Sequence, residues 1–397
     1  MINVPKIYRL LKGEGVDFVA GVPDTLLNDF CLGLDDVWRS PKHVIAANEG
    51  NAIALAAGYH LATGSVPLVY MQNSGLGNAM NPLISLVDPK VYSIPLVLLI
   101  GWRGEPGQND WPQHQRQGEL SPIMLDALAI PHRTLGSEET EAEQAVIWAV
   151  RAAQEGSRPI ALLVRREVLA KKEKAGFDAE RQKYAMSREE AIRVILANAP
   201  QDAIYVASTG RITRELHAVR AEMGQPHERD FLNVGAMGHS LSIATGIAAA
   251  HPDRNVLCLD GDGAAIMHLG SLPVTANLPL PNLLHLVLNN GAHESVGGQP
   301  TGAFDADLNA VAAASGYRTP GASAHTPEQL ADAIGRMVPA RGPCFIEVRI
   351  RKGMRADMPL LKISPQDEKA RFMKQIGEDT GRAMGHSNIP LLRVAGA

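Results

Sequence analysis

Residues 255–290, NVLCLDGDGAAIMHLGSLPVTANLPLPNLLHLVLNN, contain two short apolar runs separated by a segment of helical length. The first run ends at Asp262, which stands between Gly261 and Gly263, and the second ends at Asn289 and Asn290. A strand, a helix-length crossover and a second strand are typical of a parallel pair, whose carboxyl ends meet at one edge of the sheet. The stretch therefore predicts an acid and two amides side by side at a ligand-binding edge.

The same alternation of apolar runs and helix-length segments extends through the chain. The runs include DFVAGVP, HVIAA, VPLVYM, IPLVLLIG and RPIALLV in the first part, and DAIYVAST, DFLNV and GPCFIEVRI in the second. This pattern predicts an α/β fold of two doubly wound parallel-sheet domains. A charged segment without apolar periodicity separates them. We therefore expect a first domain at 1–168, a linker at 169–187, a second domain at 188–351 and a partly ordered extension at 352–397.

Composition narrows the class of protein. The 397 residues contain 38 Lys and Arg against 42 Asp and Glu, a net charge of −4, and no basic block lies near aromatic residues, so we expect no nucleic-acid partner. Neither a signal peptide nor an apolar run of about 18 residues is present, which predicts no membrane association. Cys31, Cys258 and Cys344 are few and widely spaced, which indicates a reducing compartment and a cytoplasmic protein.

The two strand ends carry oxygen ligands suited to a metal ion. Asp262 and the asparagine pair offer one carboxylate and one amide oxygen, and a backbone carbonyl follows closely. This set suits Mg²⁺, which keeps few protein ligands when phosphates supply the others, while Gly261 and Gly263 let the backbone pass close to a phosphate. A diphosphate brings its own negative charge, which accounts for a site with a single acid. The alternative is an ordinary turn after each strand, because either motif alone is common.

The GDG and NN motifs at this spacing resemble the signature of enzymes that use thiamine diphosphate, and that family requires a glutamate in a separate domain. The first domain contains IAANEGNAIALAAGYHLATG, where Glu49 follows an apolar run and opens a helix rich in Ala and Gly. Considered alone, Glu49 is a first-turn acid that complements the helix dipole. The resemblance implies instead that it hydrogen-bonds the aminopyrimidine ring of the cofactor and activates it. The first domain would then be pyrimidine-binding and the second diphosphate-binding.

The resemblance also implies further cofactor contacts. Met237, in NVGAMGHSLSIATGIAAA, stands at the position of the bulky apolar residue beneath the bent cofactor, although Met also fills ordinary cores. Gly235, Ser74 and His293 are further expected contacts. The resemblance also implies that Asn290, the second asparagine, and the carbonyl of Ala292 bind the metal ion beside Asp262. Family members usually join the pyrimidine domain of one subunit to the diphosphate domain of another. The resemblance therefore implies a homo-oligomer, at least a dimer, with cofactor sites at the subunit interface.

The substrate class follows from a closer resemblance. The absence of a middle domain, together with GVPDTLLNDF, NSGLGNAMNPLISL and NNGAHESVGGQPTG, resembles the two-domain phosphonopyruvate and sulfopyruvate decarboxylases, with closer similarity to the former. Residues 101–119, GWRGEPGQNDWPQHQRQGE, are predicted to form a polar loop after the end of a strand, where it can line a substrate-binding site. An Arg fork with amide donors suits a phosphonate better than an apolar pocket does. The expected substrate contacts are Arg103, Gln113, His114, Gln117 and Glu294.

Asp24 and His114 are the acid and base candidates, because GVPD and PQH match loops that bring an acid and a histidine over the cofactor in related decarboxylases. With Glu49 as activator, the resemblance implies decarboxylation of phosphonopyruvate to phosphonoacetaldehyde and carbon dioxide. From sequence alone, Asp24 is equally an N-cap for the helix that follows, and His114 is equally a solvated loop residue. Arg103 is equally a surface arginine.

Three alternative functions remain open. Sulfopyruvate decarboxylation is the nearest, because sulfonate and phosphonate differ mainly in one negative charge. A carboligase of the acetolactate type is disfavoured by the charged loop and the missing middle domain. A non-catalytic nucleotide-binding α/β protein would need no residue equivalent to Glu49, so the presence of this glutamate argues against it.

Overall fold

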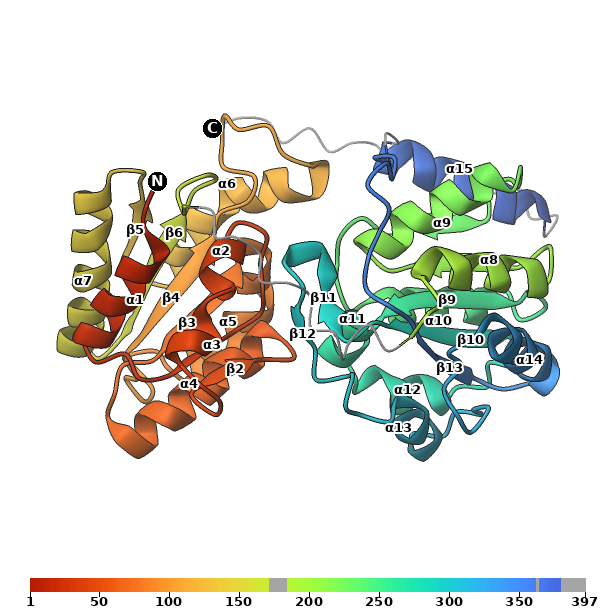
Figure 1. Cartoon of the computed structure of the whole chain (residues 1–397), viewed down its shortest axis with the longest axis horizontal. Coiled ribbons are helices and arrows are strands. Elements are labelled where there is room, and N and C mark those ends of the chain that lie inside the picture. Colours follow the sequence, from red (N-terminus) through yellow and green to blue (C-terminus); the bar gives the residue numbers. More distant parts are fainter. Residues whose placement is uncertain (171–183, 362–363, 380–397) are drawn as a thin grey trace.

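The computed structural model describes residues 1–170, 184–361 and 364–379. Figure 1 shows two α/β lobes side by side, each built around its own sheet. Every pair of neighbouring strands in these two sheets is parallel. The expected fold class of two parallel-sheet α/β domains is therefore confirmed.

The first sheet has the strand order β2-β1-β3-β4-β6-β5. Its strands are β1 (Val19–Gly21), β2 (His43–Ile45), β3 (Leu68–Gln72), β4 (Leu96–Gly101), β5 (His132–Leu135) and β6 (Pro159–Val164). Helices cover both faces, which leaves the central strands fully buried and accounts for their continuous apolar runs.

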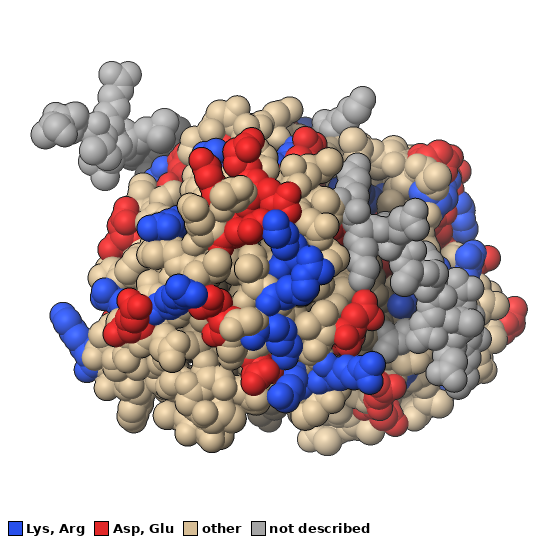
Figure 2. Space-filling view, turned by 60° about the vertical axis from the view of Figure 1, so that its left-hand side comes forward, with Lys and Arg blue, Asp and Glu red and all other residues tan. Residues whose placement is uncertain are grey.

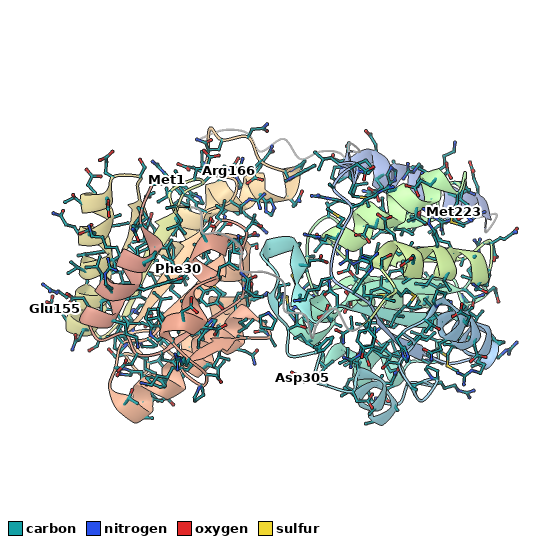
Figure 3. All side chains as sticks on the ribbon, viewed as in Figure 1. Met1, Phe30, Glu155, Arg166, Met223 and Asp305 are labelled. Carbon is teal, nitrogen blue, oxygen red and sulfur yellow. The ribbon has the colours of Figure 1, made fainter. Side chains whose placement is uncertain are left out.

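One face of the first sheet packs against α1 (Val4–Gly13), α2 (Asn28–Cys31), α3 (Leu34–Val37) and α7 (Glu139–Gly156). The other face packs against α4 (Glu49–Thr63), α5 (Leu76–Ser85) and the end of α6 (Pro112–Ala127). A short 3-10 turn, η1 (Asn73–Gly75), connects β3 to α5. Phe30, labelled in Figure 3, is completely buried and belongs to the first of these cores.

The second sheet has the order β13-β10-β9-β7-β8. Its strands are β7 (Ile204–Ala207), β8 (Asp230–Leu232), β9 (Val256–Gly261), β10 (Leu283–Asn289) and β13 (Cys344–Arg349). In the β9–β10 pair, Asp260 lies opposite Val287 and Gly261 opposite Leu288. The GDG turn and the two asparagines are therefore neighbours at the carboxyl edge, as the sequence predicts.

Helices also cover both faces of the second sheet. One core includes α8 (Arg188–Asn198), α9 (Arg211–Glu222) and α14 (Pro327–Met337), which the turn η4 (Val338–Ala340) extends. The other includes α10 (Ser240–Ala250), α12 (Ser271–Ala276), α13 (Leu308–Ala314) and α15 (Pro365–Asp379). At the carboxyl edge lie α11 (Asp262–Met267), the antiparallel pair β11 (Ala292–His293) and β12 (Gln299–Pro300), and the turn η3 (Glu294–Val296).

The segments outside the two sheets contribute unequally. Residues 171–183 of the expected linker and 380–397 of the expected extension lie outside the described residues. The described part of the extension packs on the second lobe, because Phe372 and Ile376 of α15 belong to its core and Glu368 Oε1 accepts a 2.7 Å hydrogen bond from Leu232 N. This part of the extension is therefore a structural component of the second lobe.

The two lobes touch along the side where their functional motifs lie. The Asn48 side chain, just before α4, donates to the carbonyl of Met267 at the end of α11, at 3.2 Å. Figure 1 shows β11 and β12 on the side of the second lobe that faces the first. Among the described residues, no helix combines the length and the apolar character needed to cross a bilayer.

Candidate active site

Four adjacent strands of the first sheet deliver polar residues to one edge. Asp24 follows β1, Glu49 follows β2, Asn73 and Ser74 follow β3, and Arg103 follows β4. The sheet order places these strands next to one another, and the carboxyl ends of parallel strands lie at the same edge. Asn73 joins two of these ends, since its Nδ2 donates to the Arg103 carbonyl at 2.8 Å.

Glu49 is the first residue of α4 and is almost completely buried, with 5% of its surface exposed. Asn48 caps the helix by accepting from Asn51 N, which leaves the Glu49 carboxylate free of the capping role. Its Oε2 accepts a 2.8 Å hydrogen bond from Asn78 Nδ2, and its Oε1 lies so close to Gly75 that any side chain there would collide with it. A buried carboxylate with one direct hydrogen bond suits the recognition of a ring nitrogen.

The two carboxylate oxygens of Asp24 have different surroundings. Its Oδ2 accepts hydrogen bonds from Leu26 N at 2.9 Å and Leu27 N at 3.2 Å in the turn before α2, but the N-cap position of α2 is Leu27, so the interpretation of Asp24 as a helix N-cap is wrong. Its Oδ1 is buried and finds no hydrogen-bond partner within the described part of the chain. Complete burial raises the pKa of Asp24 to about 6, although the nearby Arg103 opposes the shift. Asp24 is therefore a carboxyl group that titrates close to neutrality.

Residues 101–119 are only partly a loop. The chain leaves β4 irregularly, but α6 begins at Pro112, where proline is well suited to the first turn. Gln113, His114 and Gln117 therefore lie on the first turns of a helix, and the expectation of a loop throughout is wrong. Burial and the charge of Arg103 lower the pKa of His114 to about 4, so its ring is neutral at pH 7.

Arg103 is held by a residue that the sequence did not single out. Its Nε donates to Asp110 Oδ2 at 2.7 Å and its Nη2 to Asp110 Oδ1 at 2.5 Å. The same carboxylate accepts from Gly104 N at 3.0 Å and Trp111 N at 2.8 Å, and Arg166 Nη2 lies 3.8 Å away. Figure 3 labels Arg166 beside this loop on the first lobe. The only sequence signal for the pair was an acid seven residues beyond Arg103.

In the second lobe, Asp262 opens α11 and is 3% exposed. Thr301 donates a short hydrogen bond to its Oδ2, a contact that sequence reasoning missed because 39 residues separate the two. Burial raises the pKa of Asp262 to about 6, while Thr301 and backbone N–H groups oppose the shift. A bound cation would restore the ionised form of this carboxylate.

The two asparagines have different surroundings. Asn289 Nδ2 donates to the Ala303 carbonyl at 3.0 Å and to Glu347 Oε1 at 2.7 Å, and its Oδ1 accepts from Gly291 N at 3.0 Å. Asn290 Oδ1 accepts from Ala292 N at 3.1 Å and lies at the edge of a cavity. Asn289 therefore holds the strand end, whereas Asn290 is placed to act as a ligand.

A cavity of about 70 Å³ joins these groups. Ser208 lines it, and its Oγ is buried and has no hydrogen-bond partner among the residues that the structure describes. This unpaired hydroxyl and the oxygen ligands fit a hydrated Mg²⁺ with a phosphate group. The lining residues all belong to the second lobe: Arg188, Ser208, Thr209, Arg211, Ile212, Met237, Gly261, Asp262, Gly263, Ala264, Leu288, Asn290, Ala292, His293, Glu294 and Ser295.

Comparisons with known proteins agree with this geometry. Residues 5–129 match the thiamine pyrophosphate enzyme N-terminal TPP binding domain, and residues 209–348 match the thiamine pyrophosphate enzyme C-terminal TPP binding domain. The chain is 34% identical to the phosphonopyruvate decarboxylase of Streptomyces viridochromogenes over 94% of each chain. The chain belongs to the thiamine pyrophosphate enzyme family.

Two further relatives extend the match along the chain. The phosphonopyruvate decarboxylase of Streptomyces hygroscopicus is 33% identical over 94% of this chain and 93% of its own length. The sulfopyruvate decarboxylase of Methanosarcina acetivorans is 29% identical over 94% of this chain and 97% of its own length. Near-complete coverage places this thiamine pyrophosphate enzyme among the two-domain decarboxylases, which confirms the family expected from the sequence.

The remaining expected residues of this thiamine pyrophosphate enzyme are divided between the lobes. Met237 and His293 line the cavity with Asp262, and burial lowers the pKa of His293 to about 4. Gly235 faces the first lobe, because a side chain there would contact Gln113 at 3.6 Å. Ser74 lies at the first-lobe edge, where it accepts a 2.6 Å hydrogen bond from Gln72.

Glu294 has an environment that sequence reasoning did not foresee. Its carboxylate accepts hydrogen bonds from Arg188, from Arg211 at 3.0 Å and from Asn290 at 2.8 Å. Because each of its oxygens is engaged by cationic or amide groups, its surroundings favour holding neighbouring residues over contacting substrate. The arginines come from α8 and α9, far away in the sequence.

Proposed function

We propose that this protein catalyses the decarboxylation of phosphonopyruvate to phosphonoacetaldehyde and carbon dioxide, with thiamine diphosphate and Mg²⁺ as cofactors. The observation that carries this proposal is the match to a named phosphonopyruvate decarboxylase over 94% of both chains. The strand-end residues of the first lobe and the oxygen-lined cavity of the second support it.

The second lobe would hold the diphosphate end of the cofactor. Asp262, Asn290 and the carbonyl of Ala292 are the proposed Mg²⁺ ligands. The proposed cofactor contacts are Glu49, Ser74, Gly235, Met237, Gly261, Asp262, Gly263, Asn290 and His293. A side chain at Gly263 would collide with the His293 ring, so only glycine allows this turn to pass so close. When bound, thiamine diphosphate supplies the electron sink that decarboxylation of a 2-oxo acid needs and that side chains lack.

The first lobe would supply the proton chemistry. Glu49, buried and tied to Asn78, would hydrogen-bond the aminopyrimidine ring. Asp24 and His114 are the candidates for delivering a proton to the product carbon. Their environments favour Asp24, because its pKa of about 6 keeps roughly a tenth of it protonated at pH 7, whereas the His114 pKa of about 4 leaves that ring neutral. His114 would then serve as a hydrogen-bonding group.

The edge between β4 and α6 would bind the phosphonate. Arg103 offers a guanidinium held in one orientation by Asp110, and Arg166 adds a second positive charge nearby. Gln113 and Gln117 add amide donors from α6. A tetrahedral dianion suits such a set better than the methyl group of pyruvate does. Glu294 would act through its neighbours instead of touching substrate.

A homodimer would complete the site. The cavity around Asp262 has no first-lobe residue among its described lining, which agrees with a pyrimidine-binding surface supplied by a second subunit. Leu55 and Leu61 on α4 and Val274 on α12 are exposed. Figure 2 shows that the lower part of the molecule, where α4 lies in Figure 1, carries few charged side chains. These surfaces suit burial between subunits, which would place the cofactor sites at the interface.

The test is release of carbon dioxide by purified protein with Mg²⁺ and thiamine diphosphate, comparing phosphonopyruvate, sulfopyruvate and pyruvate. We expect phosphonopyruvate to give the highest kcat/KM. Preference for sulfopyruvate would favour the activity named for the Methanosarcina relative. Preference for pyruvate would contradict the proposed role of Arg103, and absence of turnover with all three would contradict the proposed reaction.

A further inference from the structure

Glu294 connects four segments of the second lobe at the edge of the cavity. Besides the backbone N–H of Gly353, which donates to Oε1 at 2.5 Å, it accepts from three side chains. These are Arg188 at the start of α8, Arg211 at the start of α9, and Asn290, the proposed metal ligand. The Asn290 nitrogen donates to Glu294, which fixes the amide so that its oxygen, besides accepting from Ala292 N at 3.1 Å, has a second lone pair for a metal ion. Glu294 thus orients the amide and both arginines together.

Arg211 retains unused donors in this arrangement. Its Nη1 donates to Glu294 Oε1 and its Nη2 to the Glu294 carbonyl at 2.9 Å. Within the described part of the chain these bonds use two of its five N–H groups. About a quarter of its side chain is exposed, at 26%, and it lines the same cavity as Asp262 and the unpaired hydroxyl of Ser208. The remaining donors are therefore accessible to a ligand in the cavity.

The charges around the cavity favour an anion. Arg188 is paired with both Glu215, at 2.6 Å, and Glu294. Glu294 is thus shared between two arginines, so the carboxylate that Arg211 bonds offsets the positive charge of Arg211 only in part. On the metal side the cavity offers one carboxylate, Asp262, so Mg²⁺ held there cancels only part of the charge of a diphosphate. The Arg211 guanidinium in the same cavity lining suits the remaining phosphate oxygens.

We propose that Arg211 binds the diphosphate group of the cofactor directly, and that Glu294 is the positioning residue that holds both Arg211 and Asn290 at the cavity. This inference rests on the proposed thiamine diphosphate site. It also gives a reason for the weakly charged metal site, because neutralisation of the diphosphate is divided between Mg²⁺ and an arginine.

The test measures binding to the full-length protein after removal of cofactor, in the presence of Mg²⁺. Thiamine diphosphate and inorganic pyrophosphate are titrated by calorimetry into the wild type, Arg211→Gln, Arg211→Lys and Arg193→Gln. Arg193 is a matched control, because it lies on α8, is 43% exposed and pairs with Glu222 away from the cavity. We expect Arg211→Gln to raise Kd for both ligands by roughly 10- to 100-fold and to weaken the salt dependence. Arg211→Lys should be intermediate and Arg193→Gln unchanged.

Glu294→Gln provides a second, independent measurement. We expect it to weaken Mg²⁺-dependent pyrophosphate binding while the circular dichroism spectrum stays that of the wild type, because Glu294 acts through Arg211 and Asn290. Arg211→Gln with wild-type Kd for both ligands would overturn the proposed contact while leaving the proposed reaction intact. Wild-type protein that binds neither ligand would overturn the cofactor assignment itself. Folding of Arg211→Gln is checked by its spectrum, and Arg211→Lys preserves the comparison if that variant misfolds.

Discussion

The carboxylate of Asp110 accepts two parallel hydrogen bonds from the guanidinium of Arg103, at 2.7 Å from Nε and 2.5 Å from Nη2. Burial alone would raise the pKa of Asp110, but bonds from Arg103 and from Trp111 N outweigh it and hold the pKa well below its usual range. The pair is therefore ionised at any working pH. It fixes one edge of the guanidinium and leaves the Nη1 donors for an anion.

Asp110→Asn should raise KM for phosphonopyruvate by roughly 10-fold with a smaller change in kcat, because the arginine loses its fixed orientation but keeps its charge. Steady-state kinetics on the wild type and variant measure the two constants. Glu105→Gln is the matched control, because Glu105 lies in the same loop as Asp110 but pairs with a different arginine, Arg165, at 2.8 Å. This variant should leave KM near the wild-type value. An equal fall in kcat and kcat/KM would instead place Asp110 in the chemical step.

Asp24 should make stability depend on pH. Its folded-state pKa of about 6 exceeds the ordinary aspartate value of 3.8, so the folded protein binds more protons between these pH values, and stability falls as pH rises through them. A shift of two units corresponds to about 3 kcal/mol. Urea unfolding at pH 4.5 and 7.5 should show a loss of stability that is about 2 kcal/mol smaller in Asp24→Asn than in the wild type, while Asp262, whose pKa is also raised to about 6, keeps its own contribution in both proteins. Asp332→Asn, at a residue 66% exposed, should behave as the wild type does.

The fold was predictable from the sequence because the residues that decide it are local. The apolar runs around Asp262 and Asn290 are strands that pair in parallel, so the motif and its setting follow from two neighbouring segments. Glu49 likewise lies where the sequence predicts, at the first turn of a helix after a buried strand. Periodicity and strand-end position carry this information directly.

What the sequence missed are pairings between distant charges. The contacts of Glu294 with Arg188 and Arg211 span 106 and 83 residues, and nothing in the local pattern around Glu294 distinguishes a substrate contact from the centre of an ion-pair network. The packing of α15 on β8 was missed for the same reason, because the apolar residues of the C-terminal segment do not indicate which strand or helix they pack against. The start of α6 at Pro112 was readable from proline at the first turn, but the polar composition concealed it.

Glu49→Gln should lower kcat by about 100-fold or more, because the amide cannot replace a carboxylate in activating the ring. Binding of thiamine diphosphate should be largely retained, so the cofactor should still raise the melting temperature of the variant. Carbon dioxide release and thermal unfolding measure the two effects. Glu139→Gln tests the helix-dipole alternative, because Glu139 is an exposed first-turn acid of α7 and should change neither. Near-normal turnover by Glu49→Gln would contradict the assignment.

Substitution of each of the two adjacent asparagines by alanine should have a different effect on metal binding. Asn289→Ala removes hydrogen bonds to Ala303 and to the buried carboxylate of Glu347, so it should lower the free energy of unfolding of the cofactor-free protein by about 2–3 kcal/mol. Asn290→Ala removes the proposed amide ligand together with its hydrogen bonds to Glu294 and Ala292 N, so it should lower that stability by a similar amount. It should in addition abolish Mg²⁺-dependent binding of thiamine diphosphate, which Asn289→Ala should retain.

Urea unfolding of the cofactor-free variants and a Mg²⁺ titration at fixed thiamine diphosphate separate these outcomes. Asn277→Ala is a suitable control, because the Asn277 side chain bonds only to the Pro273 carbonyl among the described residues and does not line the cavity. If Asn289→Ala lost the metal while Asn290→Ala kept it, the ligand assignment would have to move by one residue. The strand end would then present the first asparagine to the ion, against the hydrogen bonds that now bind Asn289 to Glu347.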